Sequence, residues 1–351
     1  MILVSRARGH ARRYGEAMPQ RFHMGDIPRL GGVGIFLGMA ASWLFAAVAF
    51  WAGNVGNLGI DAKLAVAFTC AVAPAFIGGA AEDLTQRLSV RYRLLLTGLS
   101  AALATWLLGA SLSRLGVPVL DGVLQALPWL GLVLAIVAVM GLPHAFNIID
   151  GYNGLSGTVA MIVALALVYV ALQVGDRQLA GILICMVGAT AGFLFWNYPR
   201  GMIFAGDGGA YVWGVTIAVC SILLVQRHSL VSPWFPMLLL IYPVWETFFS
   251  IYRKLARGVS PSVADALHFH QLIYRRIVHG VFHDDESRRM LMRNNRTSPY
   301  LWAFTGLTVV PAVLFWSNTI VLMVFCVLFV ITYVSAYLMI IRFKVPRWLR
   351  K

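Results

Sequence analysis

Ten continuous apolar runs limit the fold of this chain more than any other feature. A helix needs roughly 20 residues to cross about 30 Å of hydrocarbon, and each run is close to that length. The strands of a membrane barrel would instead alternate apolar and polar residues. The sequence therefore predicts an all-α integral membrane protein, a polytopic bundle of about ten transmembrane helices. The predicted spans are 31–53, 64–81, 94–112, 124–146, 153–173, 178–197, 209–226, 234–250, 299–316 and 319–341.

The composition agrees with this fold class. Hydrophobic residues make up 60% of the 351 residues and charged residues only 12%, which leaves too little polar surface for a soluble globule. We treat residues 1–351 as a single transmembrane domain. Its polar parts are an N-terminal segment (1–30), a long loop (251–298) and a basic tail (342–351).

The cations of the chain give it an orientation. Of the 28 Lys and Arg residues, 24 fall on one side of the predicted spans. The positive-inside rule makes that side cytoplasmic, so we expect both termini in the cytoplasm. Topology thus accounts for most of the net charge of +14, and no compact basic domain indicates a nucleic-acid partner.

The first polar motif lies where a predicted span ends on the cytoplasmic side. Glu82 and Asp83 are adjacent there, and Arg87, Arg91 and Arg93 follow. Such a group either stabilises the end of a helix by ion pairs or binds a ligand, and the two readings stand about equal.

The second motif surrounds Asp150. In a helix, Asn147, Asp150 and Asn153 would share one face, because they recur every third residue. Amides and an acid at a membrane edge need partners, and the neighbouring glycines allow a bulky ligand to approach the backbone. The motif predicts a polar binding site.

The third motif combines Asn197-Tyr198-Pro199 with Gly206-Asp207-Gly208-Gly209. Asp207 is predicted to open a helix. A carboxylate at a helix N-terminus suits a hard cation that carries phosphate oxygens. Asp also caps helices well, and both roles can hold together.

The fourth motif is the pair His268 and His270 in the long loop. Residues two apart share a face only where the backbone is extended. No cysteine lies nearby to complete a zinc site, so anion binding beside Arg275 and Arg276 is favoured. Glu246, inside a predicted span, is expected to pair with an arginine or a polar neighbour, with support of a site residue as the alternative.

Taken in order, these motifs resemble the polyprenyl-phosphate N-acetylhexosamine-1-phosphate transferase family (glycosyltransferase family 4). The peptidoglycan enzyme phospho-N-acetylmuramoyl-pentapeptide translocase is a relative. The resemblance covers about residues 21 to 300. The motifs that carry it are His23-Met-Gly-Asp-Ile-Pro28-Arg29-Leu-Gly31-Gly32, Glu82-Asp83, Asn147-Ile-Ile-Asp150-Gly151, Asn197-Tyr-Pro199, Gly206-Asp207-Gly-Gly and His268-Phe-His270.

The resemblance implies a phosphotransferase that uses Mg²⁺, with Mn²⁺ as the alternative. It would transfer a sugar-1-phosphate from a UDP-activated amino sugar to undecaprenyl phosphate and release UMP. The protein would lie in the bacterial inner membrane, in contact with membrane lipid, with its active site on the cytoplasmic face. A homodimer is one of the implied possibilities. The lipid-linked product would initiate a cell-envelope polysaccharide such as O-antigen, lipopolysaccharide or capsule.

The resemblance also implies roles for residues. Asp207 would hold the metal, and Asp83 would bind the polyprenyl phosphate or the metal. Asp150 and the amide residues would bind the donor. The histidines, with nearby arginines, would bind the diphosphate. The catalytic candidates are Asp83, Glu82, Asp150 and Asp207, and the substrate-binding candidates are Asn147, Asn153, Asn197, Arg93, His268, His270 and Arg275. Direct attack by the lipid phosphate and a route through an enzyme-bound intermediate both remain open.

The chain departs from the family pattern at three positions. Glu82 stands where Asp is usual, which argues against a nucleophilic role for it. His144 stands where Asn is common, and Gln271 replaces the last His of the usual cluster. These departures favour the branches that make surface polysaccharides.

Two further expectations concern the start of the chain and the class of protein. Family members have a transmembrane helix before the His23 motif, of which only Met1 to Val4 are present, so either this sequence starts late or the protein lacks that span. A transporter is the competing class. Transporters place ionisable groups near the bilayer midplane, which is almost bare here.

Overall fold

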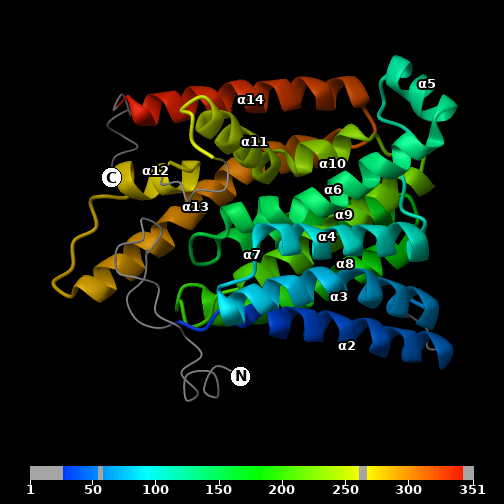
Figure 1. Cartoon of the computed structure of the whole chain (residues 1–351), viewed down its shortest axis with the longest axis horizontal. Coiled ribbons are helices and arrows are strands. Elements are labelled where there is room, and N and C mark those ends of the chain that lie inside the picture. Colours follow the sequence, from blue (N-terminus) through cyan, green and yellow to red (C-terminus); the bar gives the residue numbers. More distant parts are fainter. Residues whose placement is uncertain (1–26, 54–57, 261–266, 343–351) are drawn as a thin grey trace.

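The computed structural model describes residues 27–53, 58–260 and 267–342, and all regular structure in these ranges is helical (Figure 1). The predicted all-α membrane fold is confirmed. The start of the His23 motif and the basic tail from residue 343 lie outside the described residues. The helices are α2 (Gly31–Trp51), α3 (Ala62–Thr85), α4 (Val90–Leu108), α5 (Pro118–Ala126), α6 (Pro128–Ile149), α7 (Leu155–Gln173), α8 (Arg177–Asn197), α9 (Gly206–Arg227), α10 (Trp234–Leu239), α11 (Ile241–Leu255), α12 (Phe269–Arg276), α13 (Glu286–Leu314) and α14 (Thr319–Ile341).

Eight of the described helices are long and apolar enough to cross a membrane. The two other predicted spans correspond to α4 and to the pair α10 and α11. The helix α4 begins with Arg91 and Arg93, and the second run is interrupted at Leu240, so neither meets the same criterion. Both nevertheless lie alongside the longer helices in the bundle (Figure 1). The predicted number of spans is therefore approximate.

The long loop predicted at 251–298 is shorter in the structure. A single helix, α13, runs from Glu286 to Leu314, so the predicted span at 299–316 is only its second half. The first half is rich in arginine and projects beyond the bundle at the left of Figure 1. Hydropathy alone places the start of such a helix too late, because its first turns are polar.

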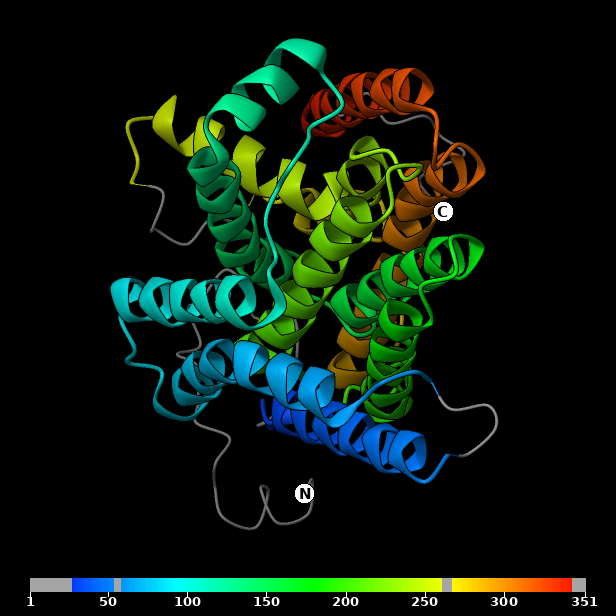
Figure 2. The ribbon, with the colours of Figure 1, turned by 90° about the vertical axis from the view of Figure 1, so that its right-hand side faces the viewer.

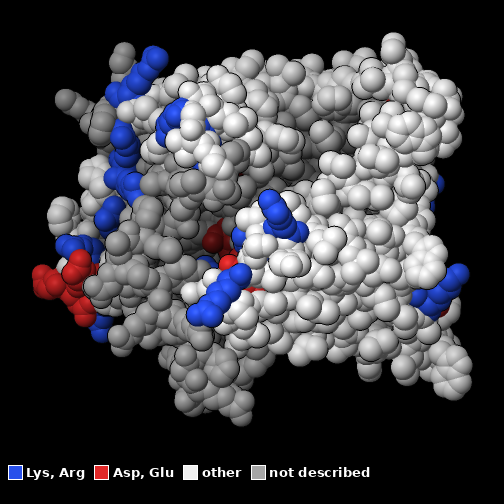
Figure 3. All heavy atoms as spheres, viewed as in Figure 1, with Lys and Arg blue, Asp and Glu red and all other residues white. Residues whose placement is uncertain are grey.

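One end of the bundle holds most of the exposed charge on the face shown in Figure 3. Lys and Arg side chains gather at the left-hand end, beside α12 and the first half of α13. Further cationic side chains flank a hollow in which Asp or Glu side chains are visible.

Helix α9 forms the centre of the bundle. It is surrounded by other helices in the end-on view of Figure 2, and all its residues from Gly206 to Val225 are buried. Small residues allow the close packing that stabilises helices in lipid. A Cβ on Gly79 of α3 would lie 2.4 Å from the backbone N of Gly208, and a Cβ on Gly32 of α2 would lie 2.3 Å from that of Gly209. Part of the Gly-rich motif therefore serves helix packing.

Backbone hydrogen bonds join the start of α2 to the segment before α9. The Phe204 N–H donates to the Pro28 carbonyl at 2.9 Å, and the N–H groups of Gly31 and Gly32 donate to the carbonyls of Phe204 and Ala205, both at 2.9 Å. The Pro28-Arg29-Leu-Gly-Gly motif is thereby fixed beside the N-terminus of α9.

We expect Gly79→Ala to destabilise the protein by about 1–3 kcal/mol, because the added methyl group would force α3 and α9 apart. Thermal unfolding of the detergent-solubilised protein measures the loss. Gly141→Ala in α6 is the matched control, since a Cβ there meets no atom within 4 Å. Equal melting temperatures for the two variants would contradict the packing described for α9.

Candidate active site

The carboxylate of Asp83, in the last turn of α3, binds the N-terminus of α9. Its Oδ1 accepts from the N–H of Asp207 and its Oδ2 from the N–H of Gly208, both at 2.9 Å. The N-cap residue of α9, Ala205, has no side chain that could do this. A carboxylate from another helix thus satisfies two free N–H groups and meets the positive end of the helix dipole.

Gly206 makes this contact sterically feasible. Its φ is +68°, and a Cβ there would lie 2.4 Å from both carboxylate oxygens of Asp83. Asp207 therefore opens α9 as predicted, but the capping carboxylate belongs to Asp83.

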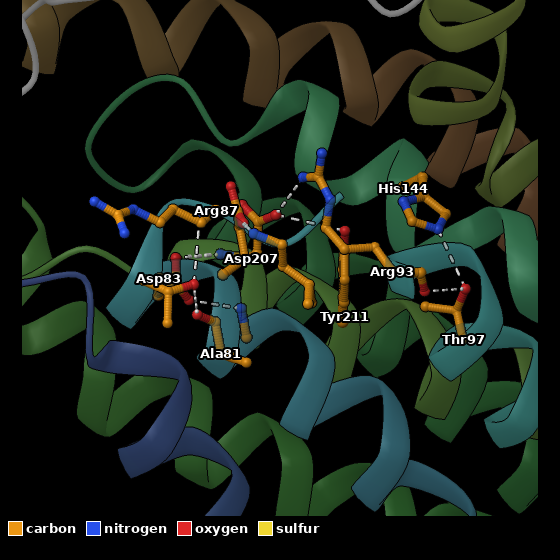
Figure 4. A network of polar contacts seen from close by, with 12 residues as sticks. Ala81, Asp83, Arg87, Arg93, Thr97, His144, Asp207 and Tyr211 are labelled. Atoms are coloured by element: carbon orange, nitrogen blue, oxygen red, sulfur yellow. Dashed lines mark hydrogen bonds and ion pairs between the residues drawn. The ribbon is translucent and has the colours of Figure 1, made fainter. Parts of the chain in front are cut away.

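Asp207 is held on one side only. Its Oδ2 accepts from Arg93 Nη1 at 3.0 Å and from the hydroxyl of Tyr211 at 3.4 Å, whereas its Oδ1 has no partner among the described residues (Figure 4). Arg93 also has a buried Nε without a hydrogen-bond partner in the described chain. One carboxylate oxygen and one guanidinium N–H thus remain for other groups.

This donor set suits Mg²⁺ with phosphate-bearing substrates. Mg²⁺ is usually bound by one or two carboxylates together with substrate phosphates and water. Asp207 Oδ1 can serve as such a ligand. Among the described residues no cluster of three or more His, Cys, Asp or Glu forms a full protein cage. Both oxygens of Asp83 already accept backbone N–H groups, so the structure favours Asp207 over Asp83 as the ligand.

The carboxylate of Glu82, the other acid of the pair, makes a different contact. Its Oε2 accepts from the N–H of Leu88 at 2.8 Å and so holds the turn between α3 and α4. This turn leads into the helix that carries Arg93. The geometry agrees with the expectation that Glu82 is not a nucleophile.

Asp150 lies directly after α6 and is half-buried. It accepts a short hydrogen bond from the hydroxyl of Ser156 at the start of α7. Burial raises the pKa of Asp150 to about 6, although the Ser156 hydrogen bond and the charge of Arg29 oppose the increase. Arg29 is therefore close enough to act on the site. It received no role from sequence, although it stands in the first motif of the resemblance.

The shared helix face of Asn147, Asp150 and Asn153 does not exist, because α6 ends at Ile149 and α7 begins at Leu155. Asn153 is instead fully buried against α13. Its backbone N–H donates to Asn294 Oδ1 at 2.8 Å, and its side-chain amide donates to Asn295 Oδ1 at 2.9 Å. The shared face was expected only if this stretch were helical, and the glycines of the motif end the helix.

Asn197 is also engaged in holding the backbone together. Its Oδ1 accepts from the N–H of Gly154 at 2.6 Å, and its Nδ2 donates to the Ile203 carbonyl at 2.8 Å. It therefore ties the loop after Asp150 to the loop before Asp207. Of the three amide residues predicted to bind substrate, only Asn147 has a side chain without a partner in the described chain, and it is half-buried.

The two histidines of the fourth motif do come together. His268 has an extended backbone as the N-cap of α12, and His270 follows inside the helix. Their rings are parallel, with centroids 5.4 Å apart. Gln271, which replaces a histidine of the usual cluster, completes a capping box with His268.

Glu246 of α11 orients His268, which agrees with the prediction that Glu246 pairs with an arginine or a polar neighbour. It is fully buried, and its Oε1 accepts from His268 Nδ1 at 2.9 Å. Its Oε2 accepts from the hydroxyl of Tyr333 at 2.6 Å. This leaves His268 Nε2 as the ring nitrogen for a ligand.

The histidines lie next to the loop after Asp150. A Cβ on Gly151 would be 3.0 Å from His270 Nε2, so the second and fourth motifs are in contact. Burial lowers the pKa of His270 to about 3, which keeps the ring neutral.

The two arginines near the histidines differ in their surroundings. Arg275 is exposed, whereas Arg276 donates to the carbonyls of Ile340 and Ile341 at the end of α14. Of this arginine pair, Arg275 fits the expected anion contact better.

The raised pKa of Asp150 predicts a pH-dependent stability. The folded protein binds the proton of this group more tightly than the unfolded chain, whose ordinary value is 3.8. Its stabilising contribution is therefore complete below pH 3.8 and is lost as the pH rises through about 6. The melting temperature should fall over this range relative to Asp150→Asn. Ser156→Ala should move this fall in melting temperature to higher pH, because it removes the hydrogen bond that lowers the pKa of Asp150. Identical pH profiles of the melting temperature for the parent protein and Asp150→Asn would contradict the raised pKa of Asp150.

Comparison with known proteins agrees with the motif-based prediction. A sequence model of the family Glycosyl transferase family 4 matches residues 65–225. The probable undecaprenyl-phosphate N-acetylglucosaminyl 1-phosphate transferase of Bacillus subtilis (strain 168) is 26% identical over 265 residues, which cover 75% of this chain and 69% of that protein.

Two other relatives match shorter parts. The undecaprenyl-phosphate alpha-N-acetylglucosaminyl 1-phosphate transferase of Thermotoga maritima is 26% identical over 58% of this chain and 60% of its own length. The phospho-N-acetylmuramoyl-pentapeptide-transferase of Chlamydia pneumoniae is 34% identical over 33% of this chain and 36% of its own length. The part of the chain that resembles glycosyl transferase family 4, residues 65–225, includes Asp83, Asp150 and Asp207.

Proposed function

We propose that the protein transfers a sugar-1-phosphate from a UDP-N-acetylhexosamine to undecaprenyl phosphate. An oxygen of the lipid phosphate forms a bond to the β-phosphorus of the donor, and the bond between that phosphorus and the bridging oxygen breaks. UMP leaves, and the sugar remains on a lipid diphosphate. The observation that carries the proposal is the convergence of Asp83, Asp207 and Arg93 at the N-terminus of α9.

The charges at this site suit two substrates that repel each other. Both substrates bear phosphates, so a site that unites them needs cationic groups and a metal. Arg93 lies at the site, and the charge of Arg29 reaches Asp150. A bound Mg²⁺ would offset the phosphate charge, with Asp207 Oδ1 as its protein ligand.

Direct attack by the lipid phosphate is the route that the geometry supports. A covalent route would need a carboxylate nucleophile that is not otherwise engaged. The open Oδ1 of Asp207 is assigned to the metal. The Glu82 carboxylate holds the Leu88 N–H, and the Asp83 carboxylate holds two N–H groups of α9. We assign Asp83 the task of positioning Asp207.

The donor side is assigned to the second and fourth motifs. Asp150 and Asn147 lie near the end of α6, and His270 contacts the loop after Asp150 at Gly151. His268 offers Nε2, because Glu246 holds its Nδ1. We infer that these residues bind the UDP-sugar and that the exposed Arg275 contributes charge at the rim.

The charge distribution supports a cytoplasmic active site in a bacterial inner membrane. The motifs belong to the side of the bundle that receives 24 of the 28 cationic residues. Both substrates could meet there, since the UDP-sugar is a soluble cytoplasmic metabolite and the lipid phosphate lies in the bilayer. The bacterial relatives act on undecaprenyl phosphate according to their names.

The test of this function is UMP release from a panel of UDP-N-acetyl sugars, measured with purified protein in detergent. UMP should form only when undecaprenyl phosphate and Mg²⁺ are both present. The accompanying product should be a lipid diphosphate sugar, detected by mass spectrometry. A folded preparation that releases no UMP with any donor of the panel would refute the proposal.

Asp207→Asn should reduce turnover by at least about 100-fold, because the amide removes the charge at the proposed metal ligand. Its melting temperature should stay close to that of the parent protein. Retained activity would remove Asp207 from the metal site.

Asp83→Asn separates positioning from metal binding. An amide has only one acceptor oxygen, so the variant loses one of the two contacts to α9. We expect a lower kcat with an unchanged Mg²⁺ concentration for half-maximal activity. A strongly raised Mg²⁺ requirement would instead make Asp83 a metal ligand.

A further inference from the structure

His144 of α6 lies beside the site but has no role in the function proposed above. Its ring packs edge-on against Tyr211, with centroids 5.0 Å apart, and Tyr211 in turn contacts Asp207. Its Nε2 is 3.2 Å from the hydroxyl oxygen of Thr97 on α4. Figure 4 shows His144 at the side of the Arg93–Asp207–Tyr211 network that is remote from Asp83.

The surroundings of Thr97 define the tautomer of His144. The Thr97 hydroxyl lies 3.1 Å from the carbonyls of both Arg93 and Leu94, one turn earlier in α4. Its single hydrogen is directed to these carbonyls, so its oxygen accepts from His144. This makes His144 Nε2 the protonated nitrogen and Nδ1 an acceptor.

Nδ1 has no partner among the described residues. This nitrogen is not fully buried, so it keeps some contact with solvent. In Figure 4 it lies on the side of the ring that faces Tyr211 and Arg93. A hydrogen-bond acceptor is therefore open toward the site.

An open acceptor distinguishes between the two substrates. An ionised lipid phosphate offers only acceptors, and its polyprenyl chain has no polar hydrogen. The UDP-sugar has hydroxyl groups and an amide N–H. If the β-phosphate binds at Arg93 and Asp207, the sugar ring, which is attached directly to it, would also lie beside this network, where His144 lies.

We propose that His144 is a specificity-determining residue that accepts a hydrogen bond from the donor sugar at Nδ1. Thr97 positions the ring through Nε2. The inference rests on the function proposed above. A ring nitrogen and an amide oxygen reach different positions, so His and Asn at position 144 should favour different sugars.

Steady-state kinetics of His144→Phe and His144→Asn test the inference. Phe keeps the ring shape but offers no acceptor, so KM for the UDP-sugar should rise about tenfold, the effect expected for one lost hydrogen bond. KM for undecaprenyl phosphate and inhibition by UMP should change less than about twofold. Asn keeps an acceptor and should alter the ratio of kcat/KM between two UDP-N-acetyl sugars.

Two further variants separate a specific contact from general damage. Thr97→Val should raise the same donor KM by a smaller factor, because it frees the ring without removing the acceptor. His279→Phe, at an exposed histidine after α12, is the matched control and should leave both KM values unchanged.

The outcomes separate this inference from the proposed function. If the parent protein turns over a donor but His144→Phe leaves the donor KM unchanged, His144 does not bind the sugar and the transferase proposal stands. An equal rise in the UMP inhibition constant would place the nucleotide there instead and would also overturn the inference. If His144→Phe does not fold, the donor preference of His144→Asn decides, and an unchanged preference refutes the role. Absence of UMP from the parent protein refutes the transferase itself.

Discussion

The contact between the Asp83 carboxylate and the first N–H groups of α9 is the interaction on which the site depends. It joins the end of α3 to the start of the central helix and fixes the backbone of Asp207. The adjoining glycines allow this approach, because a Cβ at Gly79 or Gly206 would clash with α9 or with the carboxylate itself. Close helix packing and placement of the acidic site are therefore one structural requirement.

Much of the polar sequence in the motifs serves to hold the site rather than to bind substrate. Asn197 joins two loops, Asn153 anchors one of them to α13, and Glu82 fixes the turn before α4. Glu246 orients His268 from inside the bundle. Such contacts are expected at a membrane edge, where backbone groups released from helices need partners away from water.

The sequence predicted the fold class and the similarity to a family, but it did not predict how the residues of the motifs are arranged. The apolar runs and the cation bias indicated the fold and its orientation, and the order of the motifs indicated the family. Asn147, Asp150 and Asn153 do not share a helix face, since that arrangement required a helix through Gly151 and α6 ends at Ile149. Arg29 and His144 received no role, because their interactions with the site join parts of the chain that are far apart in sequence.

The sequence by itself determined that this is a helical membrane protein with its acidic motifs on the cation-rich side. Hydrophobic length and charge bias are properties of contiguous residues, so they can be read without a fold. Only the tertiary structure decided which acid caps α9 and which keeps an open oxygen, because residues 83 and 207 are 124 positions apart. It also placed His144 beside that site, through contacts with α4 and α9 that no local pattern encodes.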